Sequence, residues 1–330
     1  MNIREILWNA ARSDEQRALP ILSFPATQKL NVTVEQLVND SELMAQAMKI
    51  VSDETNTLAA VSMMDLSVEA EAFGASVKFS KDEVPAIIGQ LISDEDEANE
   101  LEVPTLDAGR AKLYIEGVRL AKQRITDKPV LAGMIGPYSL AGRLMDVTEV
   151  MYFCYDEPET VHVVLDKAVQ YLIQYGKAMR EAGADGILMA EPLTGILSPA
   201  MAEEFSMPYV KRIIDALQDD DFAVLYHNCG NSVSSMLKPI FEQGAAAYHF
   251  GNAVSMEQVM KEAPEDALCM GNIDPSAQFA HGTPESITAA TKELIEKCGG
   301  YKNFVPSSGC DIPAHSSWDN IDAFFKALEN

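Results

Sequence analysis

Short, almost wholly apolar runs recur along the chain, and longer stretches with apolar residues at helical spacing separate them. Apolar runs of this length are typical of strands that are buried on both faces, as the strands of parallel sheets are. A piece of buried helix can show the same pattern, so the assignment depends on the regular alternation. The eight runs are Pro20–Phe24, Leu58–Met64, Val130–Ile135, Gly186–Glu191, Phe222–His227, Ala245–Phe250, Ala267–Gly271 and Asn303–Pro306.

The stretches between the runs predict helices, and several have recognisable ends. Ser198–Leu217 opens with Ser-Pro, a cap residue followed by a first-turn proline, and Gly183 and Gly299 follow two other stretches as stops. The other expected helices are Asp40–Asp53, Asp107–Arg124, Glu157–Ala182, Ser232–Gln243, Ser255–Glu262, Pro284–Cys298 and Trp318–Leu328.

Eight strands, each followed by a helix, predict an α/β fold of the (β/α)8 TIM barrel type. The residues beyond a minimal barrel lie at the N-terminus, where we expect helical additions, and between Phe73 and Val103. There the acidic segment Asp94–Glu102 indicates a solvated loop or edge. We expect a single domain over residues 1–330. The alternative is an open doubly wound sheet, but no glycine-rich phosphate loop follows the first run.

Composition and charge narrow the classes of function. Of the 330 residues 47% are apolar, and 25 basic against 50 acidic residues give a net charge of −25. Such a surface repels nucleic acid and anionic lipid, so neither is an expected partner. No apolar stretch reaches the roughly 18 residues that span a membrane, and the charged N-terminus lacks a signal peptide's apolar centre, so we expect a cytoplasmic protein. The five cysteines are then thiols rather than a disulfide framework.

The ends of the predicted strands carry the candidate chemistry, because barrel active sites lie at the C-terminal face of the strands. His227 and Cys229 end the fifth run two positions apart, so an imidazole and a thiol point to the same side. Cys310 follows the eighth run on the same face. Two thiolates and one imidazole are a known catalytic zinc set that leaves a fourth position open. A His-x-Cys pair also arises by chance, and its members are then ordinary core residues.

Other strand ends place acidic and polar residues near the same mouth. Glu191 ends the fourth run and is a ligand, a proton acceptor or a helix cap. Asp65 ends the second run and is a catalytic acid or a cap of the helix that follows. His249 ends the sixth run and is a substrate-binding residue or a satisfied barrel histidine; Glu191 and then His249 are the candidates for a fourth metal ligand. Tyr138 and Asn272, after the third and seventh runs, are expected to bind substrate.

Several segments, in order over most of the chain, are similar to the uroporphyrinogen decarboxylase superfamily. They are Met64–Ala75, Gly136–Met145, Glu191–Pro199, Gly271–Pro275, Gly282–Glu285 and Gly309–Ile321. Two motifs distinguish the branches of that superfamily. HNCG at His227–Gly230 and GCD at Gly309–Asp311 resemble the pattern of the cobalamin-dependent methyltransferases, typified by methylcobamide:coenzyme M methyltransferases.

The resemblance implies methyl transfer from a methylated corrinoid, either methylcobalamin or a corrinoid protein, to a small thiol such as coenzyme M. It also implies that His227, Cys229 and Cys310 are ligands of Zn²⁺. Glu191 stands where the family commonly has Asp, which leaves its role open. If the thiol carries an anionic group, Arg143 after the third run is expected to bind it, with Lys29 as the other basic residue near the mouth. The competing interpretation is that both bases are ordinary surface residues.

Two other functions remain open on the sequence. A uroporphyrinogen decarboxylase-like enzyme is disfavoured, because that branch is expected to carry an arginine-rich segment after the first strand and Phe24–Leu30 contains no arginine. A non-catalytic corrinoid- or metal-binding protein is the second alternative. It would close its metal site with a fourth protein ligand, whereas a catalytic zinc keeps that position exchangeable.

Overall fold

In the computed structural model, which describes residues 2–329, seven parallel strands form one curled sheet in the order β1-β4-β5-β6-β7-β8-β9. Their bounds are β1 (Ala60–Val61), β4 (Val130–Ile135), β5 (Gly186–Ala190), β6 (Ala223–Asn228), β7 (Ala247–Phe250), β8 (Cys269–Ile273) and β9 (Phe304–Ser308). An antiparallel pair, β2 (Ser76–Lys78) and β3 (Ala86–Ile88), lies in the segment that follows β1. The predicted (β/α)8 barrel class with N-terminal helical additions is confirmed.

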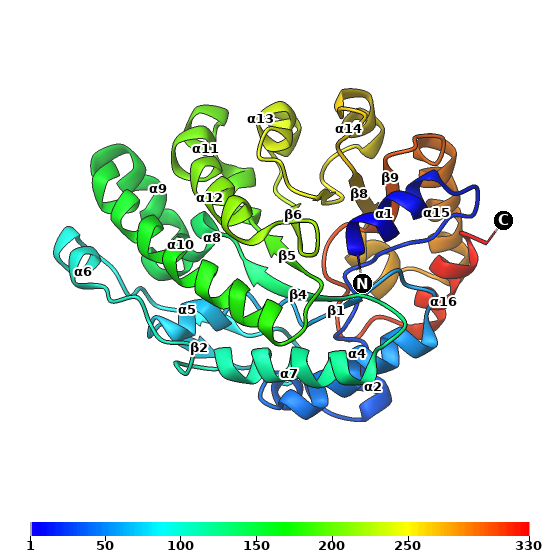
Figure 1. The fold of residues 1–330 in the computed structure, drawn as a ribbon, viewed down its shortest axis with the longest axis horizontal. Helices are drawn as coiled ribbons and strands as arrows, with labels where there is room; N and C mark the ends of the chain where they lie inside the picture. Colours follow the sequence, from blue (N-terminus) through cyan, green and yellow to red (C-terminus); the bar gives the residue numbers. More distant parts are fainter. Residues whose placement is uncertain (1, 330) are drawn as a thin grey trace.

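Helices surround the sheet, from α4 and α7 along the lower edge of Figure 1, through α10 and α12, to α13, α14 and α15. No helix within residues 2–329 combines the length and the apolar character needed to cross a membrane. The helices are α1 (Ile3–Arg12), α2 (Ala26–Leu30), α3 (Val34–Leu37), α4 (Ser41–Glu54), α5 (Val68–Ala72), α6 (Glu95–Glu100), α7 (Ala111–Arg124), α8 (Pro137–Met145), α9 (Val147–Asp156), α10 (Pro158–Glu181), α11 (Pro199–Phe205), α12 (Met207–Leu217), α13 (Leu237–Phe241), α14 (Met256–Glu262), α15 (Pro284–Cys298) and α16 (Trp318–Lys326), with the short turns η1 (Pro192–Ile196), η2 (Val233–Ser235) and η3 (Pro275–Ala280).

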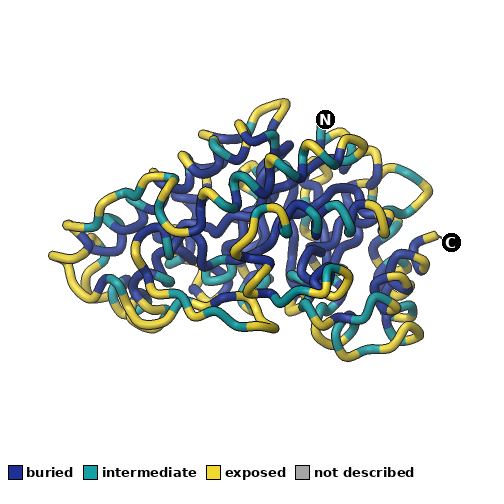
Figure 2. Tube along the Cα trace, turned by 90° about the horizontal axis from the view of Figure 1, so that it is seen from below, coloured by how far each residue is buried: buried dark blue, intermediate teal, exposed yellow. Residues whose placement is uncertain are grey.

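Successive side chains of each strand point alternately into the barrel and toward the surrounding helices. Leu131, Leu225 and Val305 belong to the inner apolar cluster, and α1 packs Ile3 and Leu7 against it. Figure 2 shows the buried segments running through the middle of the molecule and the exposed ones around its rim. Burial of such side chains contributes about 1.5–3 kcal/mol each. A shift of one residue would exchange the two faces, so this packing fixes the strand register.

The segment Pro20–Phe24 is not a strand, which corrects the prediction for the first run. The chain around it nevertheless fills the gap between β9 and β1. The Leu19 N–H donates to the Pro306 carbonyl (3.1 Å), and the Leu58 N–H donates to the Ala18 carbonyl (2.9 Å). The proline that opens the segment has no N–H to donate, so a continuous ladder cannot form there. We call residues 18–22 the closing segment.

Two other expectations were wrong in detail. The acidic segment Asp94–Glu102 contains helix α6: Asp94 accepts from the Glu97 N–H (2.8 Å), and Ala98 is buried, so the acidic first turn stabilises a helix end that is packed against the core. The single helix expected over Ser198–Leu217 is two helices, α11 and α12, since Pro208 cannot donate a helical hydrogen bond. Helices α8 and α9 were not predicted.

Candidate metal centre

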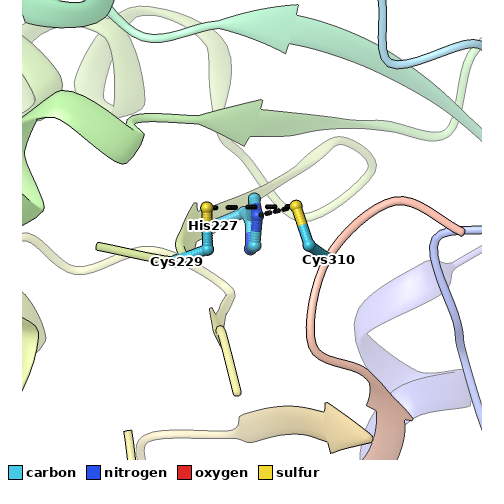
Figure 3. Close-up of side chains that lie close together, drawn as sticks. All are labelled: His227, Cys229 and Cys310. Carbon is cyan, nitrogen blue, oxygen red and sulfur yellow. Dashed lines mark hydrogen bonds between the residues drawn. The ribbon is translucent and has the colours of Figure 1, made fainter. Parts of the chain in front are cut away.

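His227, Cys229 and Cys310 meet at the C-terminal end of the barrel (Figure 3). His227 lies on β6 and Cys229 directly follows that strand, whereas Cys310 lies two residues beyond the end of β9. The Cys310 Sγ is 3.5 Å from the His227 Nε2 and 3.9 Å from the Cys229 Sγ. The three ligand atoms lie within 4.8 Å of one another. Cys310 is 83 positions from His227 and 81 positions from Cys229 in the sequence. The fold therefore brings three metal-binding atoms from distant parts of the chain to one point.

The two spacings from Cys310 match those of a tetrahedral zinc site, and the three ligand atoms all lie within 4.8 Å of one another. Zinc–sulfur bonds of about 2.3 Å and zinc–nitrogen bonds of about 2.0 Å, at tetrahedral angles, separate two sulfurs by about 3.8 Å and a sulfur and a nitrogen by about 3.5 Å. The observed separations are 3.9 Å and 3.5 Å. Soft thiolates together with an imidazole favour zinc over magnesium or calcium, which prefer oxygen ligands. The three residues therefore fit zinc in chemistry, and the two separations from Cys310 fit it in spacing.

The immediate surroundings hold the two thiols in this arrangement. Cys310 donates a hydrogen bond to Cys229, which lowers the pKa of the Cys229 thiol and raises that of Cys310 to about 12. Gly251 backs the other side of Cys229: a Cβ placed at Gly251 would lie 2.5 Å from both the Cα and the Cβ of Cys229. A side chain at position 251 would therefore push Cys229 away from its present place.

Glu191 lies at the N-terminus of α8 rather than free in the mouth. One carboxylate oxygen accepts from the Tyr138 N–H (2.9 Å), and the other accepts from the N–H (2.7 Å) and the hydroxyl of Ser139. A Cβ at Gly136 would lie 2.4 Å from this carboxylate, so glycine is required there. Burial raises the pKa of Glu191 to about 7. Both oxygens are already occupied, so the structure corresponds to the helix-cap alternative and not to a fourth metal ligand.

His249 also has no ring nitrogen to spare. Its Nδ1 is 2.8 Å from the Nδ1 of His227, and its Nε2 is 2.7 Å from the Ser307 Oγ. Burial and the adjacent His227 lower the pKa of His249 well below its usual value. Both nitrogens point to protein groups, so His249 contacts a candidate ligand instead of the metal position itself.

The two residues expected to bind substrate make internal contacts. Tyr138 is fully buried, and its hydroxyl lies 3.8 Å from the Cys154 Sγ. The Asn272 amide donates to the Gly251 carbonyl (3.0 Å) and to the Val254 carbonyl (2.6 Å). Asn272 thus holds the loop between β7 and α14, which includes the glycine that backs Cys229.

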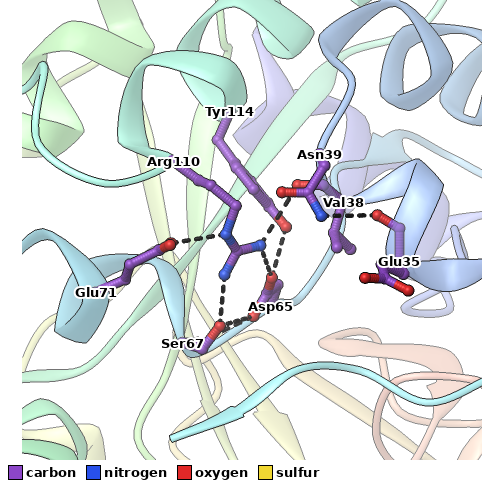
Figure 4. A network of polar contacts seen from close by, with 8 residues as sticks. All are labelled: Glu35, Val38, Asn39, Asp65, Ser67, Glu71, Arg110 and Tyr114. Atoms are coloured by element: carbon purple, nitrogen blue, oxygen red, sulfur yellow. Dashed lines mark hydrogen bonds and ion pairs between the residues drawn. The ribbon is translucent and has the colours of Figure 1, made fainter. Parts of the chain in front are cut away.

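Asp65 lies in a buried network that joins three segments of the chain (Figure 4). Its Oδ2 accepts from the Arg110 Nη1 (2.6 Å) and from the Tyr114 hydroxyl (2.8 Å), while its Oδ1 accepts from the N–H of Ser67 at the start of α5 (3.0 Å). Arg110 also pairs with Glu71 (2.7 Å). Asp65 therefore has the contacts of a cap and of a structural ion pair.

Arg143 and Lys29, the two basic residues expected near the mouth, differ in their contacts. Lys29 forms an ion pair with Glu54 (2.7 Å) and lies 4.6 Å above the Trp318 ring. Arg143 on α8 is half-buried and has no hydrogen bond or ion pair with any residue in the described range 2–329. Burial lowers the pKa of Arg143, and the nearby Asp65 charge opposes that shift. Arg143 is thus the base with capacity left for an anion.

Glu69 was not among the candidate site residues predicted from the sequence. It is fully buried on α5; its Oε1 accepts from the Ile135 N–H at the end of β4 (2.9 Å), and its Oε2 has no partner among the described residues. Burial raises the pKa of Glu69 to about 7, and the Asp65 charge adds to that shift. The sequence signal that could have identified Glu69 is its pairing with Glu71 on a short helix flanked by alanine. Two acids that are two positions apart lie on different faces of a helix, so they cannot both face the same side.

A sequence profile of the uroporphyrinogen decarboxylase (URO-D) family matches residues 7–330. The barrel with a candidate ligand set at the C-terminal face of its strands defines the class of the protein, and the chain belongs to this family. It is 27% identical to the methylcobamide:CoM methyltransferase MtbA of Methanosarcina mazei, over 99% of this chain and 97% of that protein.

The similar proteins include both methyltransferases and uroporphyrinogen decarboxylases. The chain is 24% identical to the uroporphyrinogen decarboxylase of Hydrogenovibrio crunogenus, over 94% of this chain and 89% of that protein. Among solved structures, a methyltransferase from Methanosarcina mazei superposes with a TM-score of 0.89 at 22% identity, covering 99% of this chain and 98% of that one. This superposition shows that the two chains share a fold over their whole length.

Replacing Arg110 with alanine should lower the free energy of unfolding by about 3–5 kcal/mol, because Asp65 would be left buried without its positive partner. Urea denaturation measures the change. Arg119→Ala is the control: its pair with Glu116 is exposed, and its loss should cost about 0–1 kcal/mol. Equal effects of the two substitutions would show that the buried network does not stabilise the fold.

Glu69 should make the protein less stable as the pH rises. The pKa of this carboxyl is raised in the folded state, so folding favours its protonated form; that stabilisation is complete below the unfolded pKa of 4.5 and is lost as the pH rises through about 7. Glu69→Gln removes the titrating group. The free energy of unfolding of the variant, relative to the parent protein, should therefore increase by about 2–3 kcal/mol between pH 5 and pH 8. A difference that does not change with pH would contradict the raised pKa.

Proposed function

We propose that the chain is a methyltransferase that moves a methyl group from a methylated corrinoid to a small thiol, with zinc held by His227, Cys229 and Cys310. The observation that carries the proposal is the set of two sulfurs and one nitrogen within 4.8 Å of one another, a cluster in which residues 2–329 supply three candidate ligands. Its relative from Methanosarcina mazei, a methylcobamide:CoM methyltransferase, supports the same reaction.

The chemistry requires a thiolate at neutral pH. A free thiol has a pKa of about 8.5 and is mostly protonated there. If His227, Cys229 and Cys310 hold zinc, the ion would supply a Lewis acid that lowers the pKa of an acceptor thiol. Cys229 and Cys310, as thiolates, would balance the charge of the ion, so that the acceptor sulfur keeps enough electron density to attack the methyl group. The sulfur–carbon bond would form as the cobalt–carbon bond breaks, with that electron pair left on the corrinoid and the thiol proton released to solvent. In this proposal the mouth of the barrel would hold the acceptor sulfur close to the methyl donor.

Arg143 is the proposed binding residue for an anionic group on the acceptor, such as a sulfonate or carboxylate. It is half-buried and unpaired with the described residues, whereas Lys29 already pairs with Glu54. Glu191, which accepts from the backbone of α8, fixes the N-terminal turn of the helix that carries Arg143. Glu191 is accordingly proposed to position this helix, and Asp65 to hold the adjoining loop.

The decarboxylase alternative is supported by relatives with that name. Against it, Phe24–Leu30 offers no arginine, and its one lysine is paired with Glu54. The non-catalytic alternative requires a closed metal site. Within residues 2–329 this cluster contains three candidate ligands, which favours an exchangeable fourth position.

Purified protein should contain about one zinc per chain, and Cys310→Ala should lose it. Cys310 lies on a loop beyond β9, so its removal deletes a ligand and opens no core cavity. Thiol methylation with methylcobalamin should fall by orders of magnitude while the circular dichroism spectrum stays unchanged. Cys298→Ala, which removes a buried thiol of α15, should keep its zinc. Full activity of Cys310→Ala would sink the proposed function, and loss of folding would favour a structural zinc.

Arg143→Ala should raise the Michaelis constant for an anionic thiol about tenfold to hundredfold, the loss expected for one charge-assisted hydrogen bond. The constant for an uncharged thiol of similar size should not change. Lys29→Ala serves as the control, since its charge is already paired. An unchanged constant for the anionic thiol in Arg143→Ala would remove this residue from the binding site.

A further inference from the structure

A line of buried hydrogen bonds leads away from the candidate ligand His227. The His227 Nδ1 is 2.8 Å from the His249 Nδ1, the His249 Nε2 is 2.7 Å from the Ser307 Oγ, and that hydroxyl donates to the Leu19 carbonyl (2.7 Å). The two histidines and Ser307 are all buried. The line therefore connects the candidate metal centre on β6, through β7 and β9, to the closing segment.

The strand register explains why these side chains meet. His227 and His249 are paired residues of neighbouring strands, two positions beyond Leu225 and Ala247. Leu225, Ala247 and Val305 are members of the inner apolar cluster, so the residues two positions further along also point into the barrel. The line is thus a polar layer of the barrel interior, directly above an apolar one.

Hydrogen-bonding capacity fixes the direction of every bond in this line. A carbonyl only accepts, so the single proton of the Ser307 hydroxyl goes to Leu19, and the hydroxyl must accept from the His249 Nε2. A neutral imidazole carries one N–H, so the His249 Nδ1 is a bare acceptor. The proton between the two rings therefore belongs to the His227 Nδ1, which leaves the His227 Nε2 with a free lone pair.

A second contact supports the same assignment independently. The His227 Nδ1 is also 3.3 Å from the backbone carbonyl of His249, which again can only accept a hydrogen bond. The opposite nitrogen, Nε2, is the one that lies 3.5 Å from the Cys310 Sγ. The Leu19 carbonyl at one end of the line and the His249 carbonyl next to His227 at the other therefore require the same tautomer of His227. In that tautomer Nδ1 carries the proton and Nε2 presents a lone pair to the metal position.

We propose that His249 and Ser307 are positioning residues that fix the tautomer and the ring orientation of His227, so that its Nε2 is ready to bind the metal. The inference rests on the proposed metal site and assigns a role to residues outside it. Removal of such a partner of a ligating imidazole typically lowers metal affinity 10–100-fold. The same strand, β9, supplies Ser307 and leads into Cys310, so one strand orients one ligand and delivers another.

The test compares two serines of β9. Ser307→Ala removes the acceptor of the His249 Nε2 proton, so that proton can move to Nδ1 and oppose the proton of His227. Zn²⁺ affinity, measured by competition with a chromophoric chelator, should fall 10–100-fold. Ser307→Thr keeps the hydroxyl and should restore the affinity. Ser308→Ala is the control: it loses the hydrogen bond from the Ile21 N–H (3.0 Å) but leaves the line intact, so its affinity should not change.

Nitrogen-15 NMR of the histidine rings in the metal-free protein provides a second readout that does not depend on zinc. The proposal requires a protonated Nδ1 and a bare Nε2 on His227 in the parent protein and in Ser308→Ala, and a loss of that preference in Ser307→Ala. If the parent protein shows this tautomer but does not bind zinc, the proposed function is rejected and the positioning role is kept. A protonated Nε2 on His227, or equal zinc affinities in Ser307→Ala and the parent, would overturn the positioning role.

Discussion

Closure of the barrel between β9 and the closing segment is the constraint on which the rest of the site depends. Strand β9 pairs with β8 along its length, but on its other side it meets a segment that forms isolated hydrogen bonds instead of a ladder. That junction brings the Leu19 carbonyl to Ser307 and the Ile21 N–H to Ser308. Since Cys310 follows directly, the way in which the barrel closes decides where one sulfur of the candidate metal centre lies.

The charged groups near the mouth are arranged so that most of them satisfy one another. Glu191 binds the N-terminus of α8, and Asp65 binds Arg110 together with two hydroxyls. These acids keep loops and helices in place, in a protein whose net charge is already strongly negative. Arg143 is different, because its side chain is half-buried and has no partner among the described residues. An unpaired cation at such a depth is costly without an anion, and an anionic acceptor of the kind proposed above would offset that cost.

The sequence predicted the parts of the structure that a single pattern controls. Runs such as Val130–Ile135 are apolar on both faces, as a covered parallel strand requires, and their regular alternation with helical stretches favoured strands; seven of the eight runs contain strands of the sheet. The spacing of His227 and Cys229, and the matching position of Cys310, predicted the residues that the structure brings together. What the sequence could not supply was the pairing of side chains. Whether Glu191 faces solvent, a metal or a helix end depends on where α8 starts, and the run Pro20–Phe24 looks like a strand although its neighbours leave no ladder for it.

The positions of the three candidate ligands have a thermodynamic consequence. Cys229 follows β6 and Cys310 follows β9, so an ion that binds both connects parts of the chain 81 positions apart and encloses β7, β8 and β9. An ion that binds the folded chain and not the unfolded one stabilises it by RT ln(1 + [L]/Kd), which is about 4 kcal/mol at a thousandfold excess over Kd. If the candidate site holds a metal ion, the melting temperature of the protein would therefore depend on the concentration of free metal, and chelation and heating would act on the same equilibrium.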